Sequence, residues 1–397
     1  MIKSARIKYN NTFSEEKYAN FIAESNSDVH HKIEFKICET PVFIPADFRD
    51  KLITAGNEII EMICSPDFEK QTKKAIPPNV FVPGEEGAPV FIALDFGICE
   101  NESGELLPQL IEMQGFASLY AWQHALGINY RKHFEIPDNV SHLFNNLDDK
   151  SYIELLKTNI IGDHDPKNVI VLEIEPTNQK TWIDFHLTKK LLGIEPISIT
   201  DIHKEGDKLY YHLSGEKIQI KRIYNRLIFD ELEARPDLKY NWNLTEPADV
   251  EWVCHPNWFF RISKYTLPFI NSKYVPETHF LNTIKNLPTD LENYVLKPLF
   301  SFAGHGVIFN ITPESLETAL LHAENYILQR KATYKPVIET LDDPAKCEIR
   351  LMYIWEKNKP RPTLAINLAR LSKGVMIGVD FNKNKTWVGG TVGYFEK

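Results

Sequence analysis

The chain is organised around the stretch Tyr294-Val-Leu-Lys-Pro-Leu-Phe-Ser-Phe-Ala-Gly-His-Gly-Val307. A short apolar run ends at Lys297-Pro298, a loop with Gly304 and Gly306 follows, and a second apolar run covers Val307–Ile311. This pattern predicts a hairpin with a lysine at its base. Glycines let backbone N–H groups approach an anion closely, and a lysine adds a point charge for the same anion. The stretch therefore indicates a flap over phosphates or, taken alone, an ordinary Gly-x-Gly hairpin turn with an exposed lysine.

The composition is that of an ordinary soluble globular protein, with 43% hydrophobic and 25% charged residues. A length of 397 residues allows two or three domains with a substantial core. The formal charge of −9 argues against general nucleic-acid binding, although a local basic cleft stays open. Five scattered cysteines without CxxC or Cys/His pairing fit a reducing compartment and no structural zinc. Without a long apolar run, we expect a cytoplasmic protein that binds neither membranes nor nucleic acid.

Two runs, Val90–Ile98 and Leu106–Met113, predict a pair of strands joined by a turn. The hairpin brings Asp95 towards Glu112 and Gln114 on the partner strand. Carboxylate and amide oxygens are the hard ligands that Mg²⁺ takes, with further positions left for water and phosphate. The pattern therefore predicts a magnesium site, and the alternative is a pair of strand-end carboxylates that face solvent.

The segment 166–258 has a different rhythm, in which the buried strand Val169–Ile174 is followed by the helix Thr181–Leu192 and the strand Pro196–Ile199. Strand–helix–strand in this order predicts a parallel sheet in a small α/β domain. Three polar residues surround the end of a later strand: Arg222, Asn225 and Arg226. Such strand ends are where α/β sheets bind ligands, and exposed, solvated arginines are the alternative.

Further candidates flank the flap. Lys264 precedes it, Gln329 lies in a strand expected over 326–331, and Arg350 shares one face of the strand Cys347–Ile354 with Glu348. The remaining expected elements are helices over 46–65, 118–126 and 315–326, hairpin strands over 209–213 and 217–220, strands over 364–371 (with Asn367 and Arg370 near an end) and 375–378, a mostly helical region before residue 90, and a flexible tail from Gly389.

Taken together, these motifs resemble the circularly permuted ATP-grasp families, of which glutathionylspermidine synthetase is the best-known member. Lys264, the Lys297 loop, Gln329 and Arg350 resemble the nucleotide half of such an enzyme. Asp95 with Glu112-Met-Gln114 resembles the metal-binding Asp…Glu-x-Asn strands, which ATP-grasp enzymes normally carry near the C-terminal end. Here these strands come first, so the resemblance, which covers about residues 90–395, implies a permuted α/β fold with an inserted pre-ATP-grasp-like parallel-sheet domain.

On this basis we divide the chain into four parts: a mostly helical region over 1–89, the first part of the ATP-grasp core with the metal hairpin over 90–165, the pre-ATP-grasp-like α/β domain over 166–258, and the nucleotide-binding lid with the remaining core over 259–397.

The resemblance implies an ATP- and Mg²⁺-dependent ligase that joins a carboxylate to an amine or thiol through an acyl phosphate, with small-molecule or peptide substrates. The implied metal ligands are Asp95, Glu112 and Gln114. The implied nucleotide contacts are Lys264, Lys297, Ser301, Gly304, Gly306, Gln329 and Arg350, and the implied catalytic residues are Lys297 and Arg350.

Two positions depart from the family pattern. Ala93 stands where the family tends to have an arginine, and Gln114 stands where it usually has asparagine. These departures leave open an ATP-binding module without turnover. Phosphoryl transfer to a hydroxyl is a further alternative.

Overall fold

A five-stranded antiparallel sheet forms the centre of the structure, a computed structural model that describes residues 1–27, 31–300, 306–375 and 377–397. Its strand order is β17-β16-β15-β2-β3. The strands are β2 (Phe91–Glu100), β3 (Leu106–Gln114), β15 (Lys346–Ile354), β16 (Thr363–Ser372) and β17 (Gly389–Thr391). The predicted strands over 90–98, 106–113, 347–354 and 364–371 are thus confirmed. Segments more than 200 residues apart lie side by side, because β15 pairs with β2.

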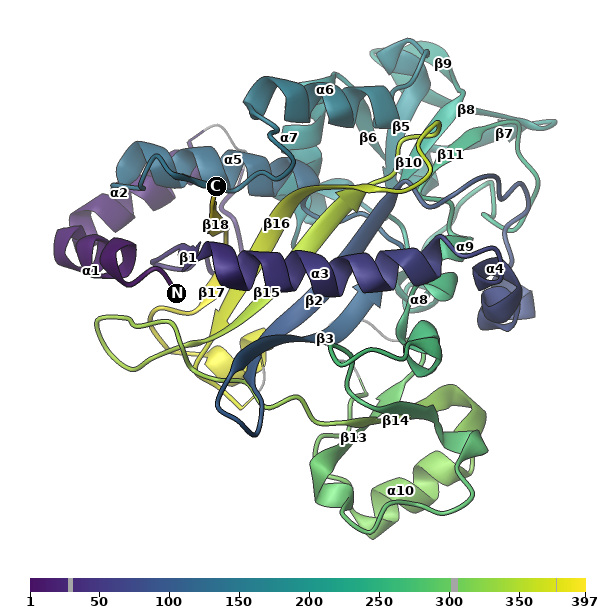
Figure 1. Ribbon diagram of the computed structural model, residues 1–397. Coiled ribbons are helices and arrows are strands. Elements are labelled where there is room, and N and C mark those ends of the chain that lie inside the picture. The colour runs from purple at the N-terminus through teal and green to yellow at the C-terminus, as the bar shows by residue number, and fades with distance from the viewer. Residues whose placement is uncertain (28–30, 301–305, 376) are drawn as a thin grey trace.

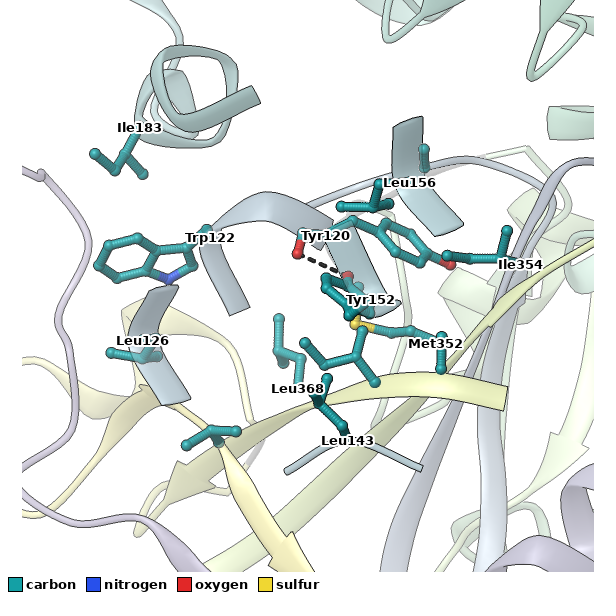
Figure 2. Close-up of a cluster of buried hydrophobic side chains, with 14 of the residues drawn as sticks. Tyr120, Trp122, Leu126, Leu143, Tyr152, Leu156, Ile183, Met352, Ile354 and Leu368 are labelled. Atoms are coloured by element: carbon teal, nitrogen blue, oxygen red, sulfur yellow. Dashed lines mark hydrogen bonds between the residues drawn. The ribbon is translucent and has the colours of Figure 1, made fainter. Parts of the chain in front are cut away.

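The central sheet has a separate hydrophobic core on each face. Side chains of a strand alternate between faces, so Leu351 packs under helix α3 (Ala46–Ile63), while Met352 packs under α5 (Tyr120–His133) and α6 (Asp149–Ile160). Figure 2 shows the second of these cores, where the Tyr152 hydroxyl donates to the Tyr120 carbonyl at 2.9 Å. The helices predicted over 46–65 and 118–126 correspond to α3 and α5.

The segment 166–258, called the α/β domain below after its predicted role, contains a four-stranded parallel sheet in the order β11-β10-β5-β6. Its strands are β5 (Val169–Glu173), β6 (Glu195–Ser198), β10 (Arg222–Asn225) and β11 (Glu251–Val253), and helix α7 (Trp182–Leu192) connects β5 to β6. The predicted parallel sheet is therefore confirmed. The hairpin predicted over 209–213 and 217–220 is also confirmed. Its strands are β8 (Lys208–Leu213) and β9 (Glu216–Ile220), which form a three-stranded sheet with β7 (His203–Glu205).

A small lobe carries the Lys297 stretch and is set apart from the central sheet (Figure 1). Its antiparallel sheet consists of β12 (Thr278–Phe280), β14 (Tyr326–Arg330) and β13 (Tyr294–Pro298), covered by α10 (Pro313–Leu320). The strand predicted over 307–311 is wrong, because only one bridge, between Leu296 and Ile308, forms there. Thr312 already caps α10, so little chain is left for a ladder. The helix predicted over 315–326 ends six residues early, because residue 326 opens β14.

The C-terminal segment is an ordered part of the core, so the flexible tail predicted from Gly389 is wrong. After β17, strand β18 (Gly393–Glu396) lies between β1 (Val42–Ile44) and β4 (Val140–Ser141). The glycine serves close packing, since a Cβ on Gly389 would lie 2.4 Å from the Lys36 carbonyl oxygen. The strand predicted over 375–378 is also wrong, since its described residues form bends.

The remaining helices are short or lie near the N-terminus. The region before residue 90 is mostly helical, as predicted, with α1 (Lys3–Thr12), α2 (Glu15–Ser25) and α4 (Phe68–Thr72) besides α3. Two further helices, α8 (Phe229–Glu233) and α9 (Asn257–Arg261), belong to the second half of the chain. The mixed α/β fold class predicted from the sequence is thus confirmed, whereas the circular permutation stays a prediction. Within the described ranges, no helix is long and apolar enough to cross a membrane.

Asn367 ties β16 to the C-terminal strand, and its removal provides a test of that connection. Its side-chain amide donates to the carbonyls of His142 (3.0 Å) and Gly393 (2.9 Å) and accepts from the Gly393 N–H (2.7 Å). Asn367→Ala should lower the free energy of unfolding by about 2 kcal/mol in urea titrations, because buried backbone groups lose their partners. The exposed Asn358→Ala is the control, and equal stability of the two variants would contradict this role.

Candidate active site

A cavity of about 1000 Å³ lies where the central sheet, the α/β domain, the small lobe and the segment 377–390 meet. Its volume is in the range of sites for cofactors and small substrates. The chain brings charged and amide side chains to it from elements that are far apart in sequence: Glu112, Gln114, Lys264, Arg350 and Arg370. Several predicted site residues therefore do gather in one place.

Asp95 lies behind this wall as the anchor of two arginines. Its carboxylate is 1% exposed and accepts two hydrogen bonds from Arg350, at 2.5 Å from Nε and 2.6 Å from Nη2. Arg370 Nη2 donates to the same carboxylate at 2.7 Å. Burial raises the pKa of Asp95, but the two guanidinium groups outweigh burial and hold that pKa below its usual value. Asp95 is therefore an ionised group that orients both arginines.

Glu348 extends this network along β15. It accepts hydrogen bonds from Arg370 and, at 2.9 Å, from the Tyr334 hydroxyl. Burial raises the pKa of Glu348, and the nearby charge of Asp95 acts in the same direction. Carboxylates and guanidinium groups thus alternate from Glu348 through Arg370 and Asp95 to Arg350. These paired charges hold the cavity wall in one geometry, although the Nε of Arg370 makes no hydrogen bond among the described residues.

Two lysines flank Glu112 on the side of the small lobe. Lys264 Nζ lies 3.6 Å from Glu112 Oε1 and its side chain is buried. Lys297 Nζ donates to the Ile111 carbonyl at 3.1 Å. Burial lowers the pKa of both ammonium groups, that of Lys297 to about 8, while the charge of Glu112 acts in the opposite direction. Because these cations are held partly away from water, an anion placed beside them would be bound strongly.

Of the three predicted metal ligands, Glu112 and Gln114 line the cavity; they are two residues apart on β3 and so point to the same side. This pair fits Mg²⁺, which is commonly bound by one or two side chains together with waters and phosphates. Asp95 does not fit as a direct ligand while it holds both arginines. No group of three His, Cys, Asp or Glu side chains arranged for a metal occurs among the residues that the structure describes. The predicted role of Asp95 as a metal ligand stays a prediction.

Other predicted nucleotide contacts lie elsewhere. Gln329 is 2% exposed in β14, where its side-chain amide donates to the Thr278 hydroxyl at 2.9 Å, and it is not part of the cavity wall. Gly306 is exposed with φ +70°, which suits a glycine in a turn. Ser301 and Gly304 lie outside the described residues.

The α/β domain contributes a charged wall that the sequence indicated only in part. Arg226 is 4% exposed and donates to Asp184 at 2.6 Å, so the alternative of an exposed, solvated arginine is wrong here. Glu173, at the end of β5, also lines the cavity, and burial raises its pKa to about 8. Glu173 was missed, although its place at the carboxyl end of a parallel strand is a signal that could have revealed it. The walls near Lys36 and residues 382–385 carry no comparable sequence signal.

Comparison with solved structures finds a similar fold in a glutathione synthetase-like effector (GSS30) from Globodera pallida, solved in its apo form. The TM-score is 0.59 at 10% sequence identity, and the alignment covers 96% of each chain. At this identity the likeness concerns the fold alone, and it is consistent with an ATP-grasp-like architecture. No family model matches the chain, and no curated protein matches it.

Proposed function

We propose that this chain is an ATP- and Mg²⁺-dependent ligase that joins a carboxylate to an amine or thiol. The observation that carries the proposal is the convergence of cations around Glu112, within a fold similar to that of a glutathione synthetase-like protein. Lys264, Arg350 and Arg370 line the cavity, and Lys297 lies near Glu112 without forming part of the cavity wall. A nucleoside triphosphate is a ligand whose charge and size suit this site.

In the proposed reaction an oxygen of the carboxylate substrate attacks the terminal phosphorus of ATP, and ADP leaves. The amine or thiol then attacks the acyl carbon, phosphate leaves, and the nucleophile loses its proton. Negative charge on the phosphoryl oxygens is stabilised by cations that are already oriented, as Asp95 orients Arg350. Mg²⁺ bound through Glu112 and Gln114 would neutralise further phosphate charge.

A second candidate is an ATP-binding module without turnover. The hydrogen bonds of Arg350 and Arg370 to Asp95 support this candidate. Of the two predicted carboxylate ligands, Asp95 and Glu112, these bonds leave Glu112 as the one open to the cavity. A site that binds a nucleotide without fully assembling the metal would have this arrangement.

Unfolding measured with ATP or ADP, each with and without Mg²⁺, tests both candidates. A nucleotide at 100 times its Kd should stabilise the native state by about 2.7 kcal/mol. Release of ADP that requires an acid together with an amine or thiol would support the ligase. Stabilisation by nucleotide without ADP release under any substrate pair would favour the binding module. Unchanged stability with every nucleotide would rule out both.

A further inference from the structure

A second cavity, of about 570 Å³, lies on the other face of the central sheet, at the end of β15. Its wall is formed by α3 through Ile53 and Asn57, by Tyr353 of β15, and by the hairpin loop that joins β15 to β16 (Figure 1). Tyr353 and Arg350 are three residues apart on one strand, so they point to opposite faces of the sheet. The second cavity is therefore distinct from the candidate active site.

Tyr353, which lines this cavity, has a buried hydroxyl group without a protein partner among the described residues. Tyr353 is 2% exposed, and its OH makes no hydrogen bond among the described residues. The OH lies against α3 at Gly56, where a Cβ would come within 2.2 Å of it. A glycine inside a helix costs about 0.5–1 kcal/mol of stability, and a buried hydroxyl without a partner costs about 1–3 kcal/mol. Two unfavourable features at one point call for a ligand that uses the hydroxyl.

Two exposed cationic side chains, Arg361 and Lys359, line the same cavity. Arg361 donates to Asn57 Oδ1 at 3.2 Å, and its charge acts to lower the pKa of Tyr353, although burial raises that pKa overall. Lys359 also lines the cavity, and its backbone carbonyl accepts from Trp355 Nε1 at 2.9 Å, which fixes the loop. In the described part of the chain, neither Lys359 nor Arg361 makes an ion pair with a carboxylate. Positive charge at this cavity is thus left without a counter-charge.

We propose that the second cavity binds the phosphate group of a small molecule. A guanidinium group matches two phosphate oxygens with parallel N–H donors, an ammonium group adds a point charge, and the buried phenol donates one further hydrogen bond. Arg361, Lys359 and Tyr353 are the residues in these roles. The volume suits a small ligand. This site does not depend on the proposed ligase activity.

Calorimetric titration with inorganic phosphate, at ionic strength held constant with NaCl, tests the proposal on the full chain. Phosphate should bind the wild type, and its Kd should rise about tenfold or more in Arg361→Ala and in Tyr353→Phe. Tyr353→Phe removes a hydroxyl without a protein partner, so this variant should fold with unchanged or higher stability. Lys357→Ala, in the same loop but outside the cavity wall, is the matched control and should bind as the wild type does.

The variant Lys297→Met distinguishes phosphate binding at the candidate active site from phosphate binding at the second cavity. Binding that survives Lys297→Met and is lost in Arg361→Ala supports the second site. Binding that is lost in Lys297→Met and unchanged in Arg361→Ala and Tyr353→Phe would overturn it, as would the absence of phosphate binding to the wild type. Acetate that binds as tightly as phosphate would overturn the assignment to phosphate. Each of these results is independent of whether ATP is bound or turned over.

Discussion

Replacing Asp95 with alanine is expected to lower the free energy of unfolding by about 3–5 kcal/mol in the absence of nucleotide and metal. Within the described part of the chain, Arg350 makes both of its side-chain hydrogen bonds to Asp95 and is 7% exposed, so the variant leaves a guanidinium charge buried without its partner. Arg370 loses one carboxylate and keeps Glu348. Urea unfolding at pH 7 in the presence of EDTA measures the change.

The sign of this change separates two roles of Asp95. An anchor for arginines stabilises the metal-free protein, so its removal destabilises it. A carboxylate kept mainly to bind metal would be an unfavourable buried charge, and its removal would leave stability unchanged or raise it. The double variant Asp95→Ala/Arg350→Met should lose less stability than the sum of the single variants. Glu105→Ala, which breaks the exposed pair with Lys51 near the same hairpin, is the control and should leave the free energy of unfolding nearly unchanged.

The pH dependence of stability gives a second measure of the same anchor. The pKa of Asp95 is lowered in the folded state, since the guanidinium groups outweigh burial. Its contribution to stability is therefore fully present above the unfolded carboxyl pKa of about 4, and it is lost as the pH falls through the folded value. Acidification below about pH 4 should cost the wild type more stability than it costs Asp95→Ala. Parallel stability curves for the two proteins would argue against an ionised Asp95.

Local patterns in the sequence were enough to predict most strands of the central sheet and the parallel sheet. Strand periodicity even placed Glu348 and Arg350 on one face of β15. The partner of Arg350, however, is 255 residues away, and no local pattern specifies which strand β15 will pair with. Sequence patterns therefore predict a metal ligand at Asp95 and a phosphate contact at Arg350 as two separate roles. They do not predict that the two side chains form an ion pair.

The errors at the ends of elements have a different origin. Glycines at 389 and 390 indicate flexibility in the sequence, but Gly390 pairs with the backbone on both sides of Ile37. Its N–H donates to the Lys36 carbonyl, and its carbonyl accepts from the Cys38 N–H. The sequence alone does not distinguish a glycine that permits close packing against a distant segment from a glycine in a flexible terminal segment. Likewise, the apolar run after Gly306 looked like a strand, although the cap of α10 follows too closely for a ladder to form. Tertiary context decided both cases.

Lys297→Met is expected to change stability and nucleotide binding in opposite directions. The folded protein lowers the pKa of Lys297 to about 8 through burial, against about 10.4 in an unfolded chain. The unfolded state therefore binds more protons between pH 8 and about 10.4, and wild-type stability should rise with pH across that window. Below pH 8 the buried ammonium lowers stability, so the variant should be more stable than the wild type at pH 7 and should lack this rise. The same change removes a cation from the phosphates and should reduce ATP-dependent turnover by about 10²–10³.

Urea unfolding at pH 7 and pH 9.5, together with ATP affinity and ADP release, measures both effects on the same preparations. Lys285→Met, which removes an exposed lysine of the small lobe, is the control and should change neither property. A Lys297 variant that is less stable at pH 7 and binds ATP as the wild type does would make Lys297 a structural residue held by its bond to Ile111. Higher stability combined with weaker nucleotide binding identifies a group whose burial is unfavourable until a phosphate is present, which is the expected property of a binding cation.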